Sequence, residues 1–110
     1  MAQTLLAQLA QGEVKFSDVL VFIEARYTHT PTAFKNGQQT NAATENQGSA
    51  KVFSFAQLNG LNKQQTLSLF AEHYTSVLNT PEASDHQNIR QFMINGWDGI
   101  QFDGTALTAK

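Results

Sequence analysis

The segment over residues 40–61 constrains the fold most, because an almost purely polar stretch leads directly into the most apolar part of the chain. Its first half, TNAATENQGS, has no large apolar side chain, whereas its second half, AKVFSFAQLNGL, carries two phenylalanines, one valine and two leucines. Ser49 is a favourable N-cap, Gly60 is a favourable C-terminal stop, and apolar residues occur on most sides between them. The sequence therefore predicts a buried helix over residues 50–59 at the centre of the fold, with a strand as the alternative because the two phenylalanines also fit a period of two.

Hydrophobic periodicity and capping signals predict four further helices. Their predicted N-caps are Thr4, Ser17, Asn62 and Ser84, and their predicted stops are Gly12, Pro81 and Gly96. An apolar stripe runs without a break from Leu67 to Leu78, so the helix after Asn62 is expected to be continuous. Gln87 stands three residues after Ser84, where a capping-box partner belongs.

Short β elements complete the predicted architecture. Asn36-Gly37 is a strong signal for a type I′ hairpin turn, whose arms would be residues 32–35 and 38–41. Residues 100–103 form a short strand candidate, and the last six residues are expected to be a loose tail. The expected fold class is α+β and mainly helical, with about five helices around a central buried helix and a small antiparallel β-hairpin or short sheet. One domain should span residues 1–110.

Composition and charge exclude several classes of function. The net charge is −2 and the seven basic residues are scattered, so we expect no nucleic acid and no membrane as partner. Because the chain has no cysteine, disulfides, thiolate chemistry and cysteine-bound metals are excluded. His29, His73 and His86 lack metal-ligand spacing and lie on different predicted elements, so we expect no metal and no cofactor.

The sequence also lacks the features of an inserted or exported chain. No apolar run approaches the roughly 20 residues that a membrane helix needs. The first sixteen residues, MAQTLLAQLAQGEVKF, have neither a basic start nor a long apolar centre. We therefore expect no cleaved secretion signal and a cytoplasmic location.

The first candidate site contains Asp85, His86, Asn88 and Arg90, at the start of a predicted helix. An acid, an imidazole and a guanidinium in this position could bind an anion or perform acid–base catalysis. The structural alternative is a helix-end charge, an exposed imidazole and a surface ion pair. Both interpretations stay open at the level of sequence.

The second candidate site contains Asn41, Glu45, Asn46, Ser49 and Lys51, in the polar half of the central segment. If a helix begins at Ser49, its free backbone N–H groups point into the loop and offer a site for phosphate or carboxylate, and Lys51 adds positive charge. The chain has no GxGxxG or GxxxxGK pattern, however. The alternative is an asparagine-rich loop that satisfies its own backbone through side-chain turns.

Four segments of the chain resemble the HopJ family. They are TPTAFKNG at residues 30–37, ENQGSAKVFSFAQLNGL at 45–61, TLSLFAEHY at 66–74 and DHQNIRQFMINGW at 85–97. The segments recur in order, and the resemblance extends over nearly the whole chain. It implies a bacterial protein of a family named as a type III secretion effector, with a protein partner that would be a host target if the chain is secreted into a host cell. It implies no catalytic residue, because the family has no agreed mechanism.

Two function hypotheses follow, and the sequence leaves open whether the protein is an enzyme. The first is a protein-interaction module, which predicts an exposed apolar patch or groove and no deep polar pocket. The second is a cytoplasmic protein that binds a small molecule or anion, or an enzyme, using Asp85, His86 and Arg90. It predicts that the two candidate sites, which are distant in sequence, converge on one concave site.

Overall fold

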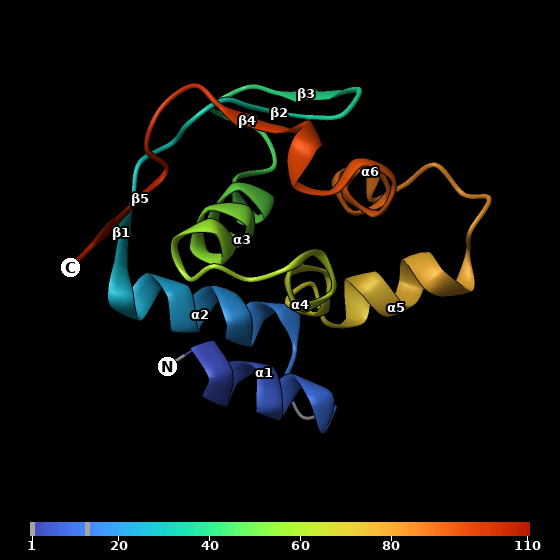
Figure 1. Cartoon of the computed structure of the whole chain (residues 1–110), viewed down its shortest axis with the longest axis horizontal. Helices are drawn as coiled ribbons and strands as arrows, with labels where there is room; N and C mark the ends of the chain where they lie inside the picture. Colours follow the sequence, from blue (N-terminus) through green and yellow to red (C-terminus); the bar gives the residue numbers. More distant parts are fainter. Residues whose placement is uncertain (1, 13) are drawn as a thin grey trace.

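Helix α3 (Gln47–Leu58), formed by the segment that changes from polar to apolar, is the centre of the molecule. The computed structural model describes residues 2–12 and 14–110. The other helices are α1 (Ala2–Ala10), α2 (Phe16–Arg26), α4 (Lys63–Ser68), α5 (Glu72–Asn79), α6 (Gln87–Asn95) and the 3-10 helix η1 (Gly96–Gly99), and the strands are β1 (Tyr27–His29), β2 (Phe34–Asn36), β3 (Gln39–Asn41), β4 (Ile100–Phe102) and β5 (Leu107–Ala109). Helix α2 lies along one side of α3 with α1 outside it, and strands β2, β3 and β4 lie on the opposite side (Figure 1). This mainly helical α+β architecture confirms the predicted fold class, and none of the described helices is long and apolar enough to cross a membrane.

The central helix is buried as predicted, but it begins at Gln47 rather than at residue 50. Its fully buried residues include Val52, Phe53, Phe55 and Ala56. The Gln47 side chain holds the first turn, because its Oε1 accepts a hydrogen bond from the backbone N–H of Thr32 at 3.0 Å and its Nε2 donates to the Glu45 carbonyl oxygen at 2.8 Å. The prediction of Ser49 as N-cap is therefore wrong, because a contact with a segment distant in sequence sets the start of the helix.

Aromatic rings join the surrounding elements to α3. The ring centroid of Phe53 lies 6.1 Å from that of Phe34, 5.4 Å from Phe70, 5.0 Å from Phe92 and 6.3 Å from Trp97. These four rings come from β2, the junction between α4 and α5, α6 and η1. One side chain of the central helix therefore contacts four parts of the fold.

The predicted hairpin is confirmed as β2–β3, with its turn one residue later than expected. Asn36 belongs to β2 and pairs with Gln39, so Gly37 takes the first central position of the turn, with a φ of 58°. Gln38, at the second central position, is not among the described residues with a positive φ. A positive φ at the first central position alone is typical of a type II′ turn rather than the predicted type I′. Strand β4, expected over residues 100–103, pairs antiparallel with the other edge of β2.

The expectation of a loose C-terminal tail is wrong. Strand β5 pairs antiparallel with β1, and the backbone N–H of Thr30 donates to the Ala106 carbonyl oxygen at 2.9 Å. Ala106 and Leu107 are both only 2% exposed. A three-residue strand with one buried side chain is too short to show alternation, and its partner is distant in the sequence.

Two N-terminal helices begin before their predicted caps. Thr4 lies inside α1, and Ser17 lies inside α2. In α2, the backbone N–H of Lys15 donates to Asp18 Oδ2 at 3.0 Å, so the acid three residues on takes the capping role. The difference is three residues for α1, which begins at Ala2 instead of Leu5, and two residues for α2, which begins at Phe16 instead of Asp18. Sequence signals locate helix boundaries less reliably than the helices themselves.

Helix α6, by contrast, begins two residues later than predicted. Its N-cap is His86 rather than Ser84, with a φ of 52°. Gln87 does meet Ser84, but its Nε2 donates to the Ser84 carbonyl oxygen at 2.8 Å, which stabilises the preceding loop instead of the helix start. The predicted stop at Gly96 is confirmed as the C-cap.

The continuous helix predicted after Asn62 is divided into α4 and α5. Its start is confirmed, because Asn62 Oδ1 accepts from the Gln65 N–H at 2.8 Å and Gln65 Oε1 accepts from the Asn62 N–H at 3.0 Å. The division lies at Ala71, which has a φ of 51° and a ψ of −122°. After it, Glu72 Oε1 accepts a hydrogen bond from the Phe16 backbone N–H at 2.7 Å. The apolar stripe is therefore real, but a tertiary contact with α2 accompanies a break in the helix that carries it.

We expect Ala71→Gly to raise the free energy of unfolding by about 1 kcal/mol. A non-glycine residue in this backbone region costs about 1–3 kcal/mol, and glycine adopts it freely, although glycine also loses about 0.4–1 kcal/mol through the unfolded chain. Ala7→Gly is the matched control, because Ala7 is exposed within α1 and glycine there should cost about 1 kcal/mol. Urea denaturation measures both, and equal destabilisation by the two changes would contradict the strain at Ala71.

Candidate functional site

One cavity lies where the first turns of α3 and α6 meet β3, the start of α2 and the junction of α4 with α5, and we call it the α3–α6 cavity. Its volume is about 420 Å³. Sites for small molecules in proteins measure about 300–1,000 Å³. The cavity is therefore large enough for a ligand of the size of a metabolite.

Four rings line part of the α3–α6 cavity, and we call them the aromatic row: Phe70, Phe16, His73 and His86. Phe16 stacks on Phe70 with centroids 5.7 Å apart, His73 meets Phe16 edge-on at 4.9 Å, and His86 lies 5.0 Å from His73. Phe70 is buried, Phe16 and His73 are half-buried, and His86 is exposed. The row therefore gives the cavity an apolar surface that ends in two imidazoles.

The first turns of α3 and α6 supply the cavity with free backbone donors, and we call them the donor end. The N–H groups of Gly48, Ser49, Gln87 and Asn88 donate to no other group in the part of the chain that the structure describes. Within the described residues, the side chains of the N-caps Asn46 and His86 make no capping hydrogen bond to their helices. The described residues that line the cavity include no Asp or Glu. Free N–H groups and the positive end of the helix dipole favour an anion at such a place.

A cluster of four asparagines, of which Asn36, Asn41 and Asn88 are buried, holds the two helix starts together. Asn41 Oδ1 accepts from Asn46 Nδ2 at 2.7 Å and from Asn88 Nδ2 at 3.0 Å, which joins the residue before α3 to the first turn of α6. Asn36 Nδ2 donates to the Asn88 carbonyl oxygen at 2.7 Å and to Asn88 Oδ1 at 3.1 Å. Asn36 and Asn41 are fully buried in the hairpin. The hairpin therefore fixes the relative position of the two parts of the donor end.

Comparison with known proteins gives a family. The family model described as HopJ type III effector protein matches residues 2–107. The chain belongs to the HopJ family. A solved structure described as the crystal structure of unknown function protein VPA0580 is 49% identical, has a TM-score of 0.91, and is aligned over 98% of this chain and 92% of that chain. Comparison with curated proteins gives no match.

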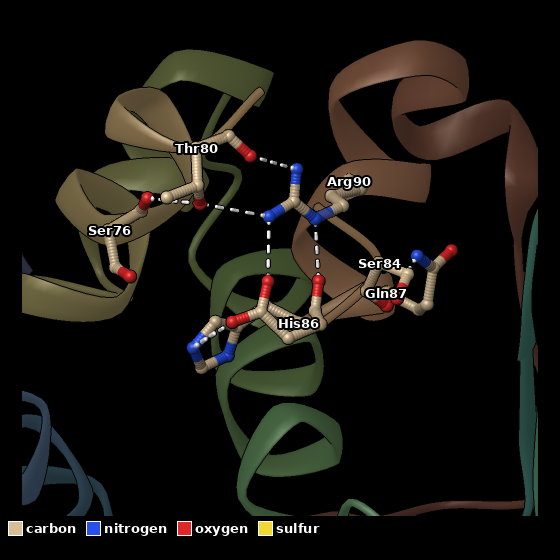
Figure 2. A network of polar contacts seen from close by, with 7 residues as sticks. Ser76, Thr80, Ser84, His86, Gln87 and Arg90 are labelled. Carbon is tan, nitrogen blue, oxygen red and sulfur yellow. Dashed lines mark hydrogen bonds and ion pairs between the residues drawn. The ribbon is translucent and has the colours of Figure 1, made fainter. Parts of the chain in front are cut away.

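In this HopJ chain the first candidate site is divided between the cavity and a loop. His86 and Asn88 line the α3–α6 cavity, whereas Asp85 and Arg90 do not. The Arg90 guanidinium donates to Asp85 Oδ1 at 2.7 Å, to the Thr80 carbonyl oxygen at 2.9 Å and to the Asp85 carbonyl oxygen, as Figure 2 shows. Arg90 therefore holds the loop between α5 and α6, which carries His86 to the cavity.

The second candidate site is divided in the same way. Asn46 and Ser49 line the cavity, and Asn41 lies behind them in the asparagine cluster. Glu45 Oε1 accepts from the Ala42 N–H at 3.0 Å, and Lys51 forms an ion pair with Glu24 of α2 at 2.8 Å. The structure thus brings Asn46 and Ser49 together with His86 and Asn88, and it places the charged members of both sets elsewhere.

Sequence reasoning did not identify the aromatic row as part of a site. The sequence singled out His73 only for its lack of metal-ligand spacing, yet after the break at Ala71 it lies between Phe16 and His86. Phe70 and Phe16 carry ordinary core spacing in the sequence. No local signal marks these residues, because three segments distant in sequence form the row.

Two carboxyl groups near the cavity have a lowered pKa. The hydrogen bond from Arg90 is the largest cause for Asp85, and it holds the pKa of that carboxyl below its usual range. Burial raises the pKa of Glu72, but hydrogen bonds from the backbone N–H groups of Phe16 and of Glu72 itself, with the charge of His73, bring it below its usual value. Both groups are therefore stabilised in their charged form by the fold.

We expect acid to destabilise the protein through these two groups. A folded-state pKa below the unfolded value contributes stability that is present above the unfolded pKa and is lost as the pH falls through the folded pKa. The Tm should therefore fall on acidification below about pH 4, the ordinary range of carboxyl groups. Glu72→Gln should make the decrease of Tm below about pH 4 less steep. The exposed control Glu82→Gln should not change this decrease. A Tm profile that is identical for wild type and Glu72→Gln would contradict this assignment.

Proposed function

We propose that the α3–α6 cavity binds a small molecule through an anionic group. The observation that carries the proposal is the convergence of two helix starts, with free N–H groups, and two imidazoles on one cavity whose described lining residues include no carboxylate. Backbone N–H groups at a helix start and protonated imidazoles both stabilise an anion. The proposal is one of binding, and no catalytic step is part of it.

Backbone strain around the cavity supports this proposal. In the described residues, the non-glycine residues with a positive φ are Asn46, Ala71 and His86. Asn46 and His86 line the cavity, and Ala71 precedes the cavity residue His73 by two positions. Such conformations cost about 1–3 kcal/mol each and cluster at functional sites. The strain is thus concentrated at the place where a ligand would bind.

Binding of inorganic phosphate, followed by calorimetry and thermal shift, tests the proposal. A ligand at 100 times its Kd should raise the free energy of unfolding by about 2.7 kcal/mol. His86→Asn keeps a residue that tolerates positive φ and removes the imidazole, so it should weaken binding about tenfold, the loss of one hydrogen bond to the anion.

His29→Asn is the matched control for this experiment. His29 contacts Gln47 at 3.1 Å and does not line the cavity, so the same chemical change there should leave the affinity for phosphate unchanged. Equal loss of binding in both variants, or no binding by the wild type to phosphate or to other small anions, would overturn the proposal.

A second candidate function, interaction with a protein partner, is favoured by one surface. An apolar groove of about 360 Å³ lies between α5 and α6, and its lining includes Leu78 and Ile94, which are 53% and 73% exposed. The groove fits the apolar face of a partner helix, which would insert apolar side chains spaced three or four residues apart. Under this second proposal the chain acts on a host protein after secretion, as the effector description of the family implies, whereas under the first it acts in the cytoplasm of the bacterium.

A photo-cross-linker at Ile94 tests the second candidate. Val21 is the matched control, because it is an aliphatic helix residue of similar exposure, 65%, that does not line the groove. We expect a discrete cross-linked partner from position 94 and not from position 21. Equal cross-linking at both positions, or none at either, would contradict an interaction through the groove.

A further inference from the structure

We infer that the ligand of the α3–α6 cavity is a phosphate monoester that carries a flat ring, with its phosphate at the donor end and its ring on the aromatic row. This inference rests on the proposed function and names the chemical class that the same cavity would take. It follows from two separate features of the lining, the ring surface of the aromatic row and the hydrogen-bond donors of the donor end.

The aromatic row leaves ring surface free for a ligand. Phe70 is only 2% exposed and stacks behind Phe16 at an interplanar angle of 8°, so the available rings are those of Phe16, His73 and His86. The His86 side chain is 33% exposed although it contacts His73. Ring surfaces that remain partly exposed at a cavity are used for stacking on planar groups, which they bind with little dependence on the identity of the ring.

The donor end favours phosphate over carboxylate. Two separate helix starts provide four free backbone N–H groups, and the hydroxyls of Ser49 and Ser84 line the same cavity. A phosphate monoester presents three terminal oxygens in a tetrahedral arrangement, whereas a carboxylate presents two in one plane. Donors that arrive from two helices and from a loop are better matched by the tetrahedral group.

The acidic side chains near the cavity are compatible with a phosphate at the donor end. Asp85 Oδ2 lies 3.9 Å from His86 Nε2, but its carboxylate is paired with Arg90 and does not line the cavity. Glu72 accepts the Phe16 N–H and likewise lies outside the lining. Both of these acids are therefore engaged by the protein, and neither is among the residues that line the cavity.

The test compares matched probes by calorimetry: phenyl phosphate, ethyl phosphate, inorganic phosphate and benzoate. Wild type should bind phenyl phosphate about 3- to 10-fold more tightly than ethyl phosphate, the gain of one aromatic contact. Phe16→Leu keeps the apolar volume and removes one of the three available rings, so this ratio should fall toward one. Phe22→Leu is the control, because Phe22 lies on the same helix, is half-buried, and does not line the cavity.

The outcomes separate this inference from the proposed function. Equal affinity of wild type for phenyl and ethyl phosphate would contradict a ligand with a flat ring, but would leave the proposed anion site in place. Benzoate bound as tightly as phenyl phosphate would overturn the choice of phosphate. No binding of any probe would overturn both proposals. If Phe16→Leu does not fold, ring-current shifts of the phenyl phosphate protons in wild type decide, and their absence would contradict stacking on the row.

Discussion

Replacement of Phe53 by alanine should lower the free energy of unfolding by about 3–5 kcal/mol. The Phe53 ring is fully buried in α3 and contacts rings from β2, the α4–α5 junction, α6 and η1. Alanine would leave a cavity bordered by four separate elements, so no single neighbour can move to fill it. Because small domains have only about 5–15 kcal/mol of stability, this one change should remove much of it.

Phe102→Ala is the comparison for this prediction. Phe102 is half-buried in β4 and stacks on Phe34 at 5.1 Å, so its removal opens a site that water can reach. Its effect should be clearly smaller than that of Phe53→Ala in urea denaturation. If Phe53→Ala cost less than Phe102→Ala, α3 would not be the element that holds the fold together.

Replacement of Asn41 by leucine should cost at least about 2 kcal/mol and also abolish phosphate binding. Asn41 is fully buried, and its amide meets Asn46, Asn88 and the Phe34 carbonyl oxygen. Each buried group that loses its partner costs about 1–3 kcal/mol, and members of a network depend on one another. Binding should be lost because the starts of α3 and α6 would no longer be held in one position.

Thr40→Ala in the same strand is the control, because Thr40 is exposed and should change stability by less than about 0.5 kcal/mol. Urea denaturation and phosphate calorimetry on both variants measure the two effects. A folded Asn41→Leu protein that bound phosphate as well as wild type would show that the asparagine cluster supports the fold without positioning the cavity.

The elements with strong local signals could be predicted from the sequence. The buried helix α3 follows from apolar residues on most sides, and the start of α4 follows from the reciprocal cap between Asn62 and Gln65. The β2–β3 hairpin follows from Asn36-Gly37, although burial of the Asn36 side chain moves the turn by one residue. Local chemistry was sufficient in these cases because the partners are close in sequence.

The features that depend on distant contacts could not be predicted. The break at Ala71 interrupts a regular apolar stripe, and the pairing of β5 with β1 joins the two ends of the chain. The α3–α6 cavity likewise depends on contacts between residues that are distant in sequence. Asn46 was chosen as a residue of the loop before a helix and His86 as a residue near a helix start, and both line the cavity. Arg90 is engaged by the loop between α5 and α6, which its sequence position does not reveal.

A titration of the ¹⁵N-labelled protein with inorganic phosphate, followed by two-dimensional NMR of the backbone amides, tests the central claim most directly. Binding in the α3–α6 cavity should shift the amide signals of Gly48, Ser49, Gln87 and Asn88 first and most, because their N–H groups are the free donors. Exposed amides in α1 should not move. Shifts that spare these four amides, or that are spread over basic residues of the surface, would contradict a phosphate site at the starts of α3 and α6.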